Sequence, residues 1–540
     1  MSKKDFGNTA VLEKKESRNL AKKNSMLRVK AMESVTVDEH SAHGAHGLIR
    51  TLGAWDLINL GIGCIIGTGI FVLTGIAASN YAGPGVFFSF IFAGTACALA
   101  ALVYSEFASL VPLSGSAYTY VYVTLGELAA WLIGWNLLLE YLVSVSVVAI
   151  GWSAYFCNIM KNFGVTLPAV LTASPGTSDV PGAIMNLPAL AITIALTFLA
   201  IAGIKNSTVF NNIIVTIKVS VVLFFIAFGA FHLHPEYWHP FIPPRIAIPT
   251  GHTMDILHLP FNEFLVKLVH GTLGVHNDLV YHYGWEGVLT AAGIVFFAYI
   301  GFDAVTTVAE ESKNPQRDLP IGILGSLVIC TVLYLVVSLI LTGLIPVTID
   351  GKPNPALTGH EAGAALSVAF TALGHKWAAL IIGFGALCGM TSIILVMIVG
   401  QSRILFSMSR DGLLPKFFSA IHPKYRTPYV SSLITGLLSG IIAAFIPILT
   451  VAELTSIGTL AAFVFVCIAV LILRSTRPDL KAKFRCPWMP LTGILGVIVN
   501  VLLMTGLPTA TWLRFVVWMV IGLAIYYLYG FWFSKMRVEK

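Results

Sequence analysis

A glycine-rich run inside the first long apolar segment carries the clearest chemistry in this sequence. Five of the eleven residues from Gly61 to Phe71 (GIGCIIGTGIF) are glycine or threonine. Glycine in a helix interior costs about 1 kcal/mol relative to alanine, so the run predicts a local break in a helix. Backbone N–H groups freed at a break can bind a carboxylate, and freed carbonyls can accept hydrogen bonds from an ammonium group. The run is therefore suited to bind a small zwitterion through main-chain atoms.

A second interrupted apolar segment lies at the matching place in the other half of the chain. It runs from Phe296 to Ala304 (FFAYIGFDA), with an aromatic cluster, Gly301 in the middle and an acid two residues beyond. Taken alone, the spacing of Gly63 and Gly67 fits a helix-packing face equally well, whereas a dinucleotide-binding loop fits poorly because no strand precedes the run. Two interrupted segments at matching positions favour a ligand site at the middle of a membrane.

Three ionisable residues, Glu140, Lys218 and Asp303, lie deep inside apolar segments, where burying a charge costs several kcal/mol. Lys218 is about eleven residues from either end of its segment, roughly 16 Å along a helix, which is too far for its ammonium to reach the interface. Burial disfavours the charged ammonium, so Lys218 can release and rebind a proton. Glu140 fits either a pair with a cationic side chain or a structural hydrogen bond. Asp303 fits either a helix cap or a functional role.

The composition indicates that lipid surrounds most of the chain. Of 540 residues, 56% are hydrophobic and 11% are charged, whereas a soluble protein keeps roughly a quarter of its residues charged. The net charge of +7 does not indicate a nucleic-acid partner, because Lys and Arg are confined to particular loops. The seven cysteines lie mostly in apolar segments without CxxC pairs and are expected to be small buried hydrophobes. We expect no enzyme activity, metal or cofactor, since the apolar segments hold no nucleophile–base pair or ligand cluster.

Twelve apolar segments of about the length of a membrane-crossing helix follow a polar tail. We predict helices near residues 54–79, 84–111, 128–160, 188–204, 207–232, 286–311, 320–345, 376–408, 429–448, 452–474, 488–507 and 511–534. The tail, residues 1–50, has no secretory signal and is expected to be flexible. Lys and Arg are concentrated on the tail's side of the membrane, so both chain ends are expected in the cytoplasm.

With this orientation, residues 233–285 form an extracellular loop between the fifth and sixth helices. The stretch 232–285 holds eight of the fourteen histidines, for which pH sensing and metal binding are the functional alternatives. Their spacing follows no metal-ligand pattern, so we expect a solvated, partly ordered loop. The tail histidines His40, His43 and His46 likewise fit a flexible segment better than a metal site.

The two interrupted segments resemble those of the amino acid–polyamine–organocation superfamily. Within it, the chain is most similar to the cationic amino acid transporter family and its bacterial relatives. The resemblance covers roughly residues 50–475 and implies the leucine-transporter fold, with inverted repeats of five helices each in 51–232 and 286–475 and two further helices with a cytoplasmic tail in 476–540. The positions that carry it are residues 63–71 and 297–303, Glu310, Glu311, residues 401–403 (QSR), residues 407–412 (SMSRDG) and Pro415.

The same resemblance implies roles for individual residues. Lys218 would bond to carbonyls of the broken first helix, where sodium-coupled relatives bind an ion, so that its protonation biases the two access states. Glu140 would lie near the substrate or in helix packing, and Met390 would line the side-chain pocket or pack the core. Phe297 would also form part of the gate. The implied substrate contacts are backbone groups: the N–H groups of Thr68 and Gly69 for a carboxylate, and the carbonyls of Ile65, Phe297, Ala298 and Ile300 for an ammonium.

We therefore predict a secondary transporter of the plasma membrane that carries L-amino acids together with protons by alternating access. Open alternatives are a proton-independent exchanger, a carrier of cationic amino acids, a channel and, less favoured because the tail is simple, a non-transporting nutrient sensor. The expected partners are the amino acid, protons and the lipid bilayer, with no nucleic acid. The sequence leaves open which amino acid is carried and whether a small single-span membrane subunit binds.

Overall fold

The computed structural model describes residues 51–110, 116–177, 180–203, 208–249, 255–270, 279–349, 352–358, 363–476 and 482–535. The predicted tail and its histidines lie outside these residues. The regular structure of the described chain is helical except for two small antiparallel hairpins, β1 (Ile246–Pro249) with β2 (Leu279–His282) and β3 (Thr348–Ile349) with β4 (Lys352–Pro353). The all-helical prediction is confirmed.

Eight helical segments of the described chain are long and apolar enough to cross a membrane, and four further apolar helices are shorter. Together they cover the predicted spans, although the segment Gly69–Leu110 joins the second half of the first predicted span to the second. The α-helices are α3 (Ala54–Ile65), α4 (Thr74–Ala77), α5 (Val86–Leu110), α6 (Ser116–Thr124), α7 (Glu127–Asn162), α8 (Leu187–Ile201), α9 (Thr208–Ala230), α10 (Phe261–Val269), α11 (Gly284–Val295), α12 (Pro315–Leu344), α13 (Pro355–Thr358), α14 (Ala365–Ala372), α15 (Lys376–Arg410), α16 (Tyr429–Phe445), α17 (Ile448–Thr476), α18 (Leu491–Thr505), α19 (Thr509–Ile525) and α20 (Phe531–Phe533).

The first predicted helix break is present. Helix α3 ends at Ile65, and Ile66 is extended with φ −72° and ψ 102°. The chain then resumes as a π-helical turn, Gly69–Leu73, and continues through α4 and a second π-helical turn, Ala78–Ala82. The cluster of glycines thus interrupts regular hydrogen bonding where the sequence predicts it.

The second predicted break is also present. Helix α11 passes into a short 3₁₀ segment, Phe296–Tyr299, and Ile300 is extended. Gly301 follows with φ 114°, a conformation that L side chains rarely adopt, and a 3₁₀ segment, Phe302–Glu311, completes the span. Gly301 occupies the cap position of that segment, so Asp303, for which a helix cap was one of two alternatives, lies in the first turn.

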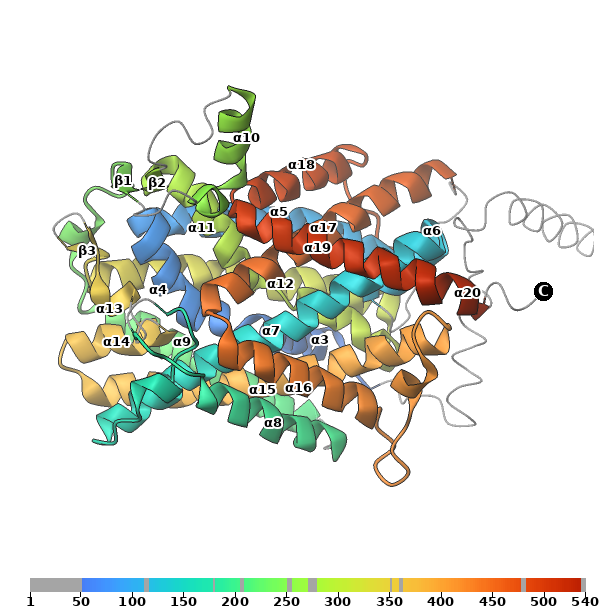
Figure 1. Ribbon diagram of the computed structural model, residues 1–540, viewed down its shortest axis with the longest axis horizontal. Coiled ribbons are helices and arrows are strands. Elements are labelled where there is room, and N and C mark those ends of the chain that lie inside the picture. Colours follow the sequence, from blue (N-terminus) through green and yellow to red (C-terminus); the bar gives the residue numbers. More distant parts are fainter. Residues whose placement is uncertain are drawn as a thin grey trace, which may run out of the picture.

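The broken segments lie at the centre of the helix bundle. Nearly all of the span that begins with α11 is buried by other helices, whereas many large apolar side chains of α18 and α19 are exposed, as expected for helices that face lipid. Helix α15 packs most extensively against α7, and α12 against α5 and α3. Figure 1 shows the long helices running in broadly one direction, with β1, β2 and β3 at one end and α6 and α20 at the other.

A buried ion pair ties the end of α5 to the end of α17. Arg474 donates from Nε to Glu106 Oε1 at 2.9 Å and from Nη2 to Glu106 Oε2 at 2.7 Å. The backbone N–H of Cys486, in the connection to α18, donates to the same carboxylate at 2.8 Å. Because Glu106 is almost fully buried, its charge depends on all three bonds for stabilisation.

We expect the substitution Glu106→Gln to lower the free energy of unfolding by about 2 kcal/mol, because the neutral amide loses charge-assisted bonds and leaves Arg474 unpaired. The melting temperature of the detergent-purified protein measures this effect. Glu286→Gln is the matched control, since the pair of Glu286 with Arg245 is much more exposed and should contribute less than about 1 kcal/mol. Equal losses for the two variants would contradict the expectation.

Candidate functional site

The two breaks lie against each other, backbone to backbone. A Cβ atom built on Gly69 would come within 2.2 Å of Ala298 Cα, and one on Gly301 would lie 2.9 Å from the carbonyl oxygen of Cys64. No side chain fits at either position without displacing main chain. Glycine at these two positions therefore lets the broken segments meet through their peptide groups.

A small cavity of about 20 Å³ lies where the breaks meet. Five of the six predicted substrate-contact residues line it, and the sixth, Ala298, packs directly on Gly69. A cavity of this size holds about one water molecule, so the broken segments are drawn together in this conformation and must separate to admit a larger ligand. The lining residues are Cys64, Ile65, Gly67, Thr68, Gly69, Ser144, Val148, Phe297, Ile300, Ile393 and Met397.

Two buried hydroxyls of the small cavity lack a partner. Within the part of the chain that the structure describes, neither Thr68 Oγ1 nor Ser144 Oγ has a hydrogen-bond partner. An unsatisfied buried hydroxyl is costly, and a polar group of a bound ligand would satisfy both. Sequence reasoning missed Ser144, because a serine within the apolar run of α7 gives no signal of the cavity it faces.

Tyr334 of α12 bridges the two breaks. Its hydroxyl is fully buried and lies 2.8 Å from the carbonyl oxygen of Ile65 and 3.0 Å from that of Ala298. A phenol has one proton to donate, so it is shared between two carbonyls that the resemblance assigns to a substrate ammonium. Tyr334 therefore occupies these acceptors while the cavity is contracted. The sequence offers only a tyrosine in an apolar run, which is equally typical of core packing.

Lys218 of α9 bonds to the broken first helix. Its fully buried Nζ donates to the carbonyl oxygen of Gly63 at 2.6 Å. The aliphatic part of the side chain packs against Gly389 of α15, where an added Cβ would lie 3.1 Å from Lys218 Cγ and Cε. One side chain thus spans three elements, α9, α3 and α15, at the depth of the break.

Comparison with known proteins identifies the family. The model of the amino acid permease family matches residues 52–530. The chain belongs to this family. It is 43% identical over 506 residues to the methylthioribose transporter of Bacillus subtilis, covering 94% of this chain and 98% of that protein. It is 44% identical over 516 residues to the branched-chain amino acid permease BcaP of the same organism, covering 95% and 100%.

A plant relative is more distant. The chain is 36% identical over 460 residues to the vacuolar cationic amino acid transporter 4 of Arabidopsis thaliana, covering 84% of this chain and 68% of that protein. The predicted membership of the amino acid–polyamine–organocation superfamily is confirmed. Because the family consists of transporters, this permease is a multi-pass membrane transporter and not an enzyme.

The remaining predicted residues of the permease lie around the small cavity and not in it. Glu140 is buried beside Thr459 of α17 and near Asp303, so two of the candidate acids share one region. Met390 is fully buried outside the cavity, whereas Ile393 and Met397, further along α15, line it. The packing alternative for Met390 is therefore the one that its position favours.

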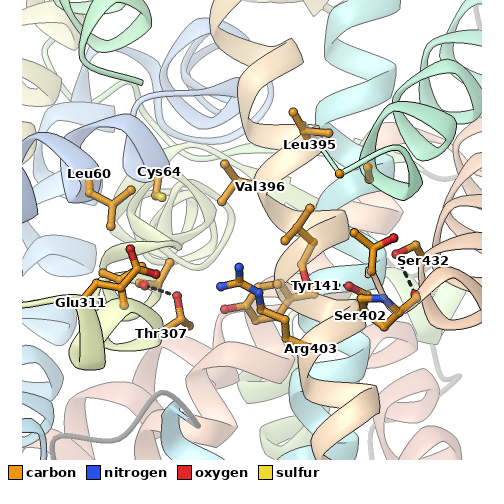
Figure 2. Close-up of a pocket in the computed structure, with 18 of the residues that line it drawn as sticks. Leu60, Cys64, Tyr141, Thr307, Glu311, Leu395, Val396, Ser402, Arg403 and Ser432 are labelled. Atoms are coloured by element: carbon orange, nitrogen blue, oxygen red, sulfur yellow. Dashed lines mark hydrogen bonds between the residues drawn. The ribbon is translucent and has the colours of Figure 1, made fainter. Parts of the chain in front are cut away.

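A larger cavity of about 450 Å³ adjoins the small one, and Cys64 lines both. Charged side chains stand on its opposite walls. Glu311 is contributed by the segment after the second break and Arg403 by α15, and Figure 2 shows them facing each other across the cavity. Asp56 of α3 and Arg426 also line it. Sequence reasoning noted Glu311 and Arg403 only as part of a resemblance and did not place them in one vestibule.

Histidines of the 233–285 loop do not form a metal site among the described residues, since no three His, Cys, Asp or Glu side chains gather there or elsewhere in them. His282 instead stacks on Tyr81 with ring centroids 5.6 Å apart, and its Nδ1 contacts the carbonyl oxygen of Asn80. Burial lowers the pKa of His282, which favours the neutral ring. Its role there is to hold the loop against the end of the first broken span.

We expect Tyr334→Phe to reduce substrate uptake by about tenfold, because removing the hydroxyl leaves buried carbonyls of both breaks unsatisfied, at roughly 1–3 kcal/mol each. Uptake of a radiolabelled amino acid into proteoliposomes measures the effect.

Tyr299→Phe is the matched control for this experiment. It removes an equally buried hydroxyl that donates at 2.9 Å to the carbonyl of Phe90 in α5, away from the first break. Uptake reduced equally in both variants would show that general stability, and not the bridge between the breaks, explains the result.

Proposed function

We propose that this permease accumulates L-amino acids by proton-coupled symport with alternating access. The observation that carries the proposal is the meeting of two broken helices at a cavity lined by main chain, with Lys218 bonded to the first of them. When the segments separate, the N–H groups of Thr68 and Gly69 face a carboxylate. The carbonyls of Ile65, Phe297, Ala298 and Ile300 then face an ammonium group.

The wall that a substrate side chain would meet is apolar. Val148 of α7 and Ile393 and Met397 of α15 line the small cavity. An apolar wall favours a neutral, apolar side chain over a cationic one, because a buried guanidinium or ammonium would have no counter-charge. Similarity to a branched-chain amino acid permease agrees with this choice. We therefore place branched-chain and other small apolar amino acids first.

Methylthioribose is the second candidate substrate. A relative of comparable similarity is a methylthioribose transporter. That compound carries hydroxyls and a thioether, for which the free hydroxyls of Thr68 and Ser144 are suitable partners. Competition of unlabelled methylthioribose with labelled leucine, valine and alanine in the same vesicles separates the two substrates.

The inverted-repeat organisation is part of the proposal. The first break opens a set of five helical spans that ends with α9, and the second opens a set that ends with α17, leaving α18 and α19 as additional helices. We place residues 51–232 and 286–475 in the two repeats, with twelve crossings and both chain ends in the cytoplasm of a bacterial cell. With that orientation, the larger cavity is the cytoplasmic vestibule, and the conformation is open toward the inside.

Lys218 is proposed to carry the coupled proton. Its bond to Gly63 holds α9 on the broken first helix while the ammonium is charged. Loss of the proton removes the charge and weakens that bond, so α3 and α9 can shift relative to each other. The two protonation states therefore favour different arrangements of the helices that flank the substrate cavity.

We expect Lys218→Met to abolish accumulation driven by a proton gradient while the protein still folds, because methionine fills the space but carries no proton. Uptake into proteoliposomes with and without an inwardly directed proton gradient measures this. Lys376→Met, at the exposed start of α15, should behave as wild type. Gradient-driven accumulation by the Lys218 variant would refute proton coupling through this residue, and a proton-independent exchanger would then be the better description.

The vestibule is proposed to close by pairing its opposed charges. Glu311 belongs to a unit with the start of α3, because the N–H groups of Thr51 and Leu52 both donate to its carbonyl at 3.0 Å. Arg403 belongs to α15, which packs on α7. Within the described residues no ion pair is formed by Arg403 in this conformation. Closure would bury both charges, and an unpaired buried charge costs several kcal/mol, so the two must meet.

We expect Arg403→Glu and Glu311→Arg each to lower uptake by about tenfold or more, since like charges then oppose closure, and the double exchange to recover most of the loss. Arg410→Glu reverses a charge on the same helix outside the vestibule and should change uptake little. Failure of the double variant to recover, with both single variants impaired, would contradict the pairing.

A further inference from the structure

Helix α10, outside the substrate site, has two faces of opposite character. Apolar side chains recur at Phe261, Phe264, Leu265, Leu268 and Val269, the spacing of one helix face. Glu263, Lys267 and His270 fall on the opposite side of the same helical wheel. The predicted solvated loop therefore contains an amphipathic helix that sequence reasoning did not identify.

The first turn of α10 is fixed to the connection between α18 and α19. The ring of Phe261 stacks on Trp512 of α19 with centroids 4.4 Å apart and an interplanar angle of 20°. The N–H of Phe261 donates to the carbonyl of Leu507 at 3.0 Å, and the N–H of Thr509 donates to that of Leu259 at 2.9 Å. These bonds place α10 level with the adjoining ends of α18 and α19, whose outer surfaces are apolar.

The polar face of α10 is turned toward the bundle. Arg245, just before β1, lies 3.1 Å from Glu263 Oε1 and 2.9 Å from Glu286 Oε2, at the start of α11. One arginine thus joins α10 to the outer end of the second broken span. With the polar side held in this way, the apolar side is directed away from the β1–β2 hairpin.

The apolar face of α10 beyond its first turn is uncovered. Leu265, Leu268 and Val269 are 39%, 51% and 81% exposed. Figure 1 shows α10 lying across the direction of α18 and α19 and extending outward from the bundle. A helix that lies across membrane-crossing helices at their ends is placed to run along the membrane surface. Leu502 of α18 and Leu513 of α19, near the same ends of these helices, are exposed as well.

We infer that α10 is a membrane-surface anchor whose face formed by Leu265, Leu268 and Val269 enters the boundary between headgroups and acyl chains of the adjacent leaflet. Lipid is the occupant because α10 is bonded to the connection between α18 and α19, whose exposed apolar side chains are those expected of lipid-facing helices. A membrane-spanning partner helix would lie along α19 and not across it. An amphipathic helix at this depth buries its apolar side in the leaflet and keeps its charges in the headgroup layer.

The anchor has a consequence for the second broken span. Through Arg245, α10 is linked to the first turn of α11, which leads directly into the break at Ile300 and Gly301. A helix held in the leaflet fixes the depth of that end of the broken span in the membrane. The inference concerns where α10 lies, and it stands whichever substrate or coupling ion the permease uses.

Spin labels placed one at a time on α10 in the full-length protein, reconstituted in phosphatidylethanolamine–phosphatidylglycerol vesicles, test the inference. The native cysteines are first replaced, and each variant is checked for a single monodisperse gel-filtration peak. Labels at Leu265→Cys, Leu268→Cys and Val269→Cys should be relaxed several-fold more by oxygen, which partitions into lipid, than by a water-soluble nickel chelate. Labels at Lys267→Cys and His270→Cys, on the polar side and outside the pair with Arg245, are the controls and should show the reverse preference.

Two outcomes would overturn the inference. Strong relaxation by the nickel chelate at all five positions would show that α10 is surrounded by water. Protection of the apolar positions from both reagents, with dipolar broadening between labels, would show that a second copy of the chain covers the face. When Leu268→Asp is added to the variant labelled at Val269→Cys, relaxation of the label by the nickel chelate should increase. This result would further support insertion in lipid, because a buried carboxylate opposes insertion.

Discussion

The need to satisfy backbone polar groups away from water governs this structure. In the interior of a membrane protein, an N–H or carbonyl that loses its helical partner must find another or line a cavity. Breaking two spans at the same depth creates several such groups in one place, and the glycines at 69 and 301 bring them into contact. The proposed ligand contacts and the stability of the bundle therefore involve the same few peptide groups.

Two side chains show how the bundle satisfies these backbone groups without a ligand. Lys218 engages the carbonyl of Gly63, and Tyr334 engages one carbonyl from each break. Each comes from a helix other than the broken ones, so α9 and α12 stabilise the breaks from outside. The hydroxyls of Thr68 and Ser144 have no partner among the described residues, and a ligand that bonded to them would complete the proposed site.

The charged side chains of the vestibule are also divided between different elements. The acidic groups of the vestibule belong to α3 and to the segment after the second break, whereas its basic groups belong to α15 and to the connection after it. Hydrogen bonds between residues 51–52 and Glu311 join the two acidic elements into one unit. Motion of that unit relative to α15 changes the solvation of all four charges at once. Such a coupling between movement and electrostatics is what alternating access requires.

The sequence alone determined the features that depend on local physics. The glycine cluster of the first segment and Gly301 of the second predict the breaks, because glycine is poor in a helix interior. The lengths of the apolar runs predict the helices, because a bilayer has a fixed thickness. The depth of Lys218 follows from counting residues. In contrast, other features depend on which helix faces lie together. They are the role of Tyr334, the unsatisfied hydroxyl of Ser144, the position of Met390 outside the cavity and the opposed charges of Glu311 and Arg403. A helix that is apolar all round does not encode its neighbours, so only the tertiary structure could decide these contacts. Helix α10 lies between these two cases. The sequence shows its amphipathic periodicity, but only the tertiary structure shows its contacts with Trp512 and Arg245.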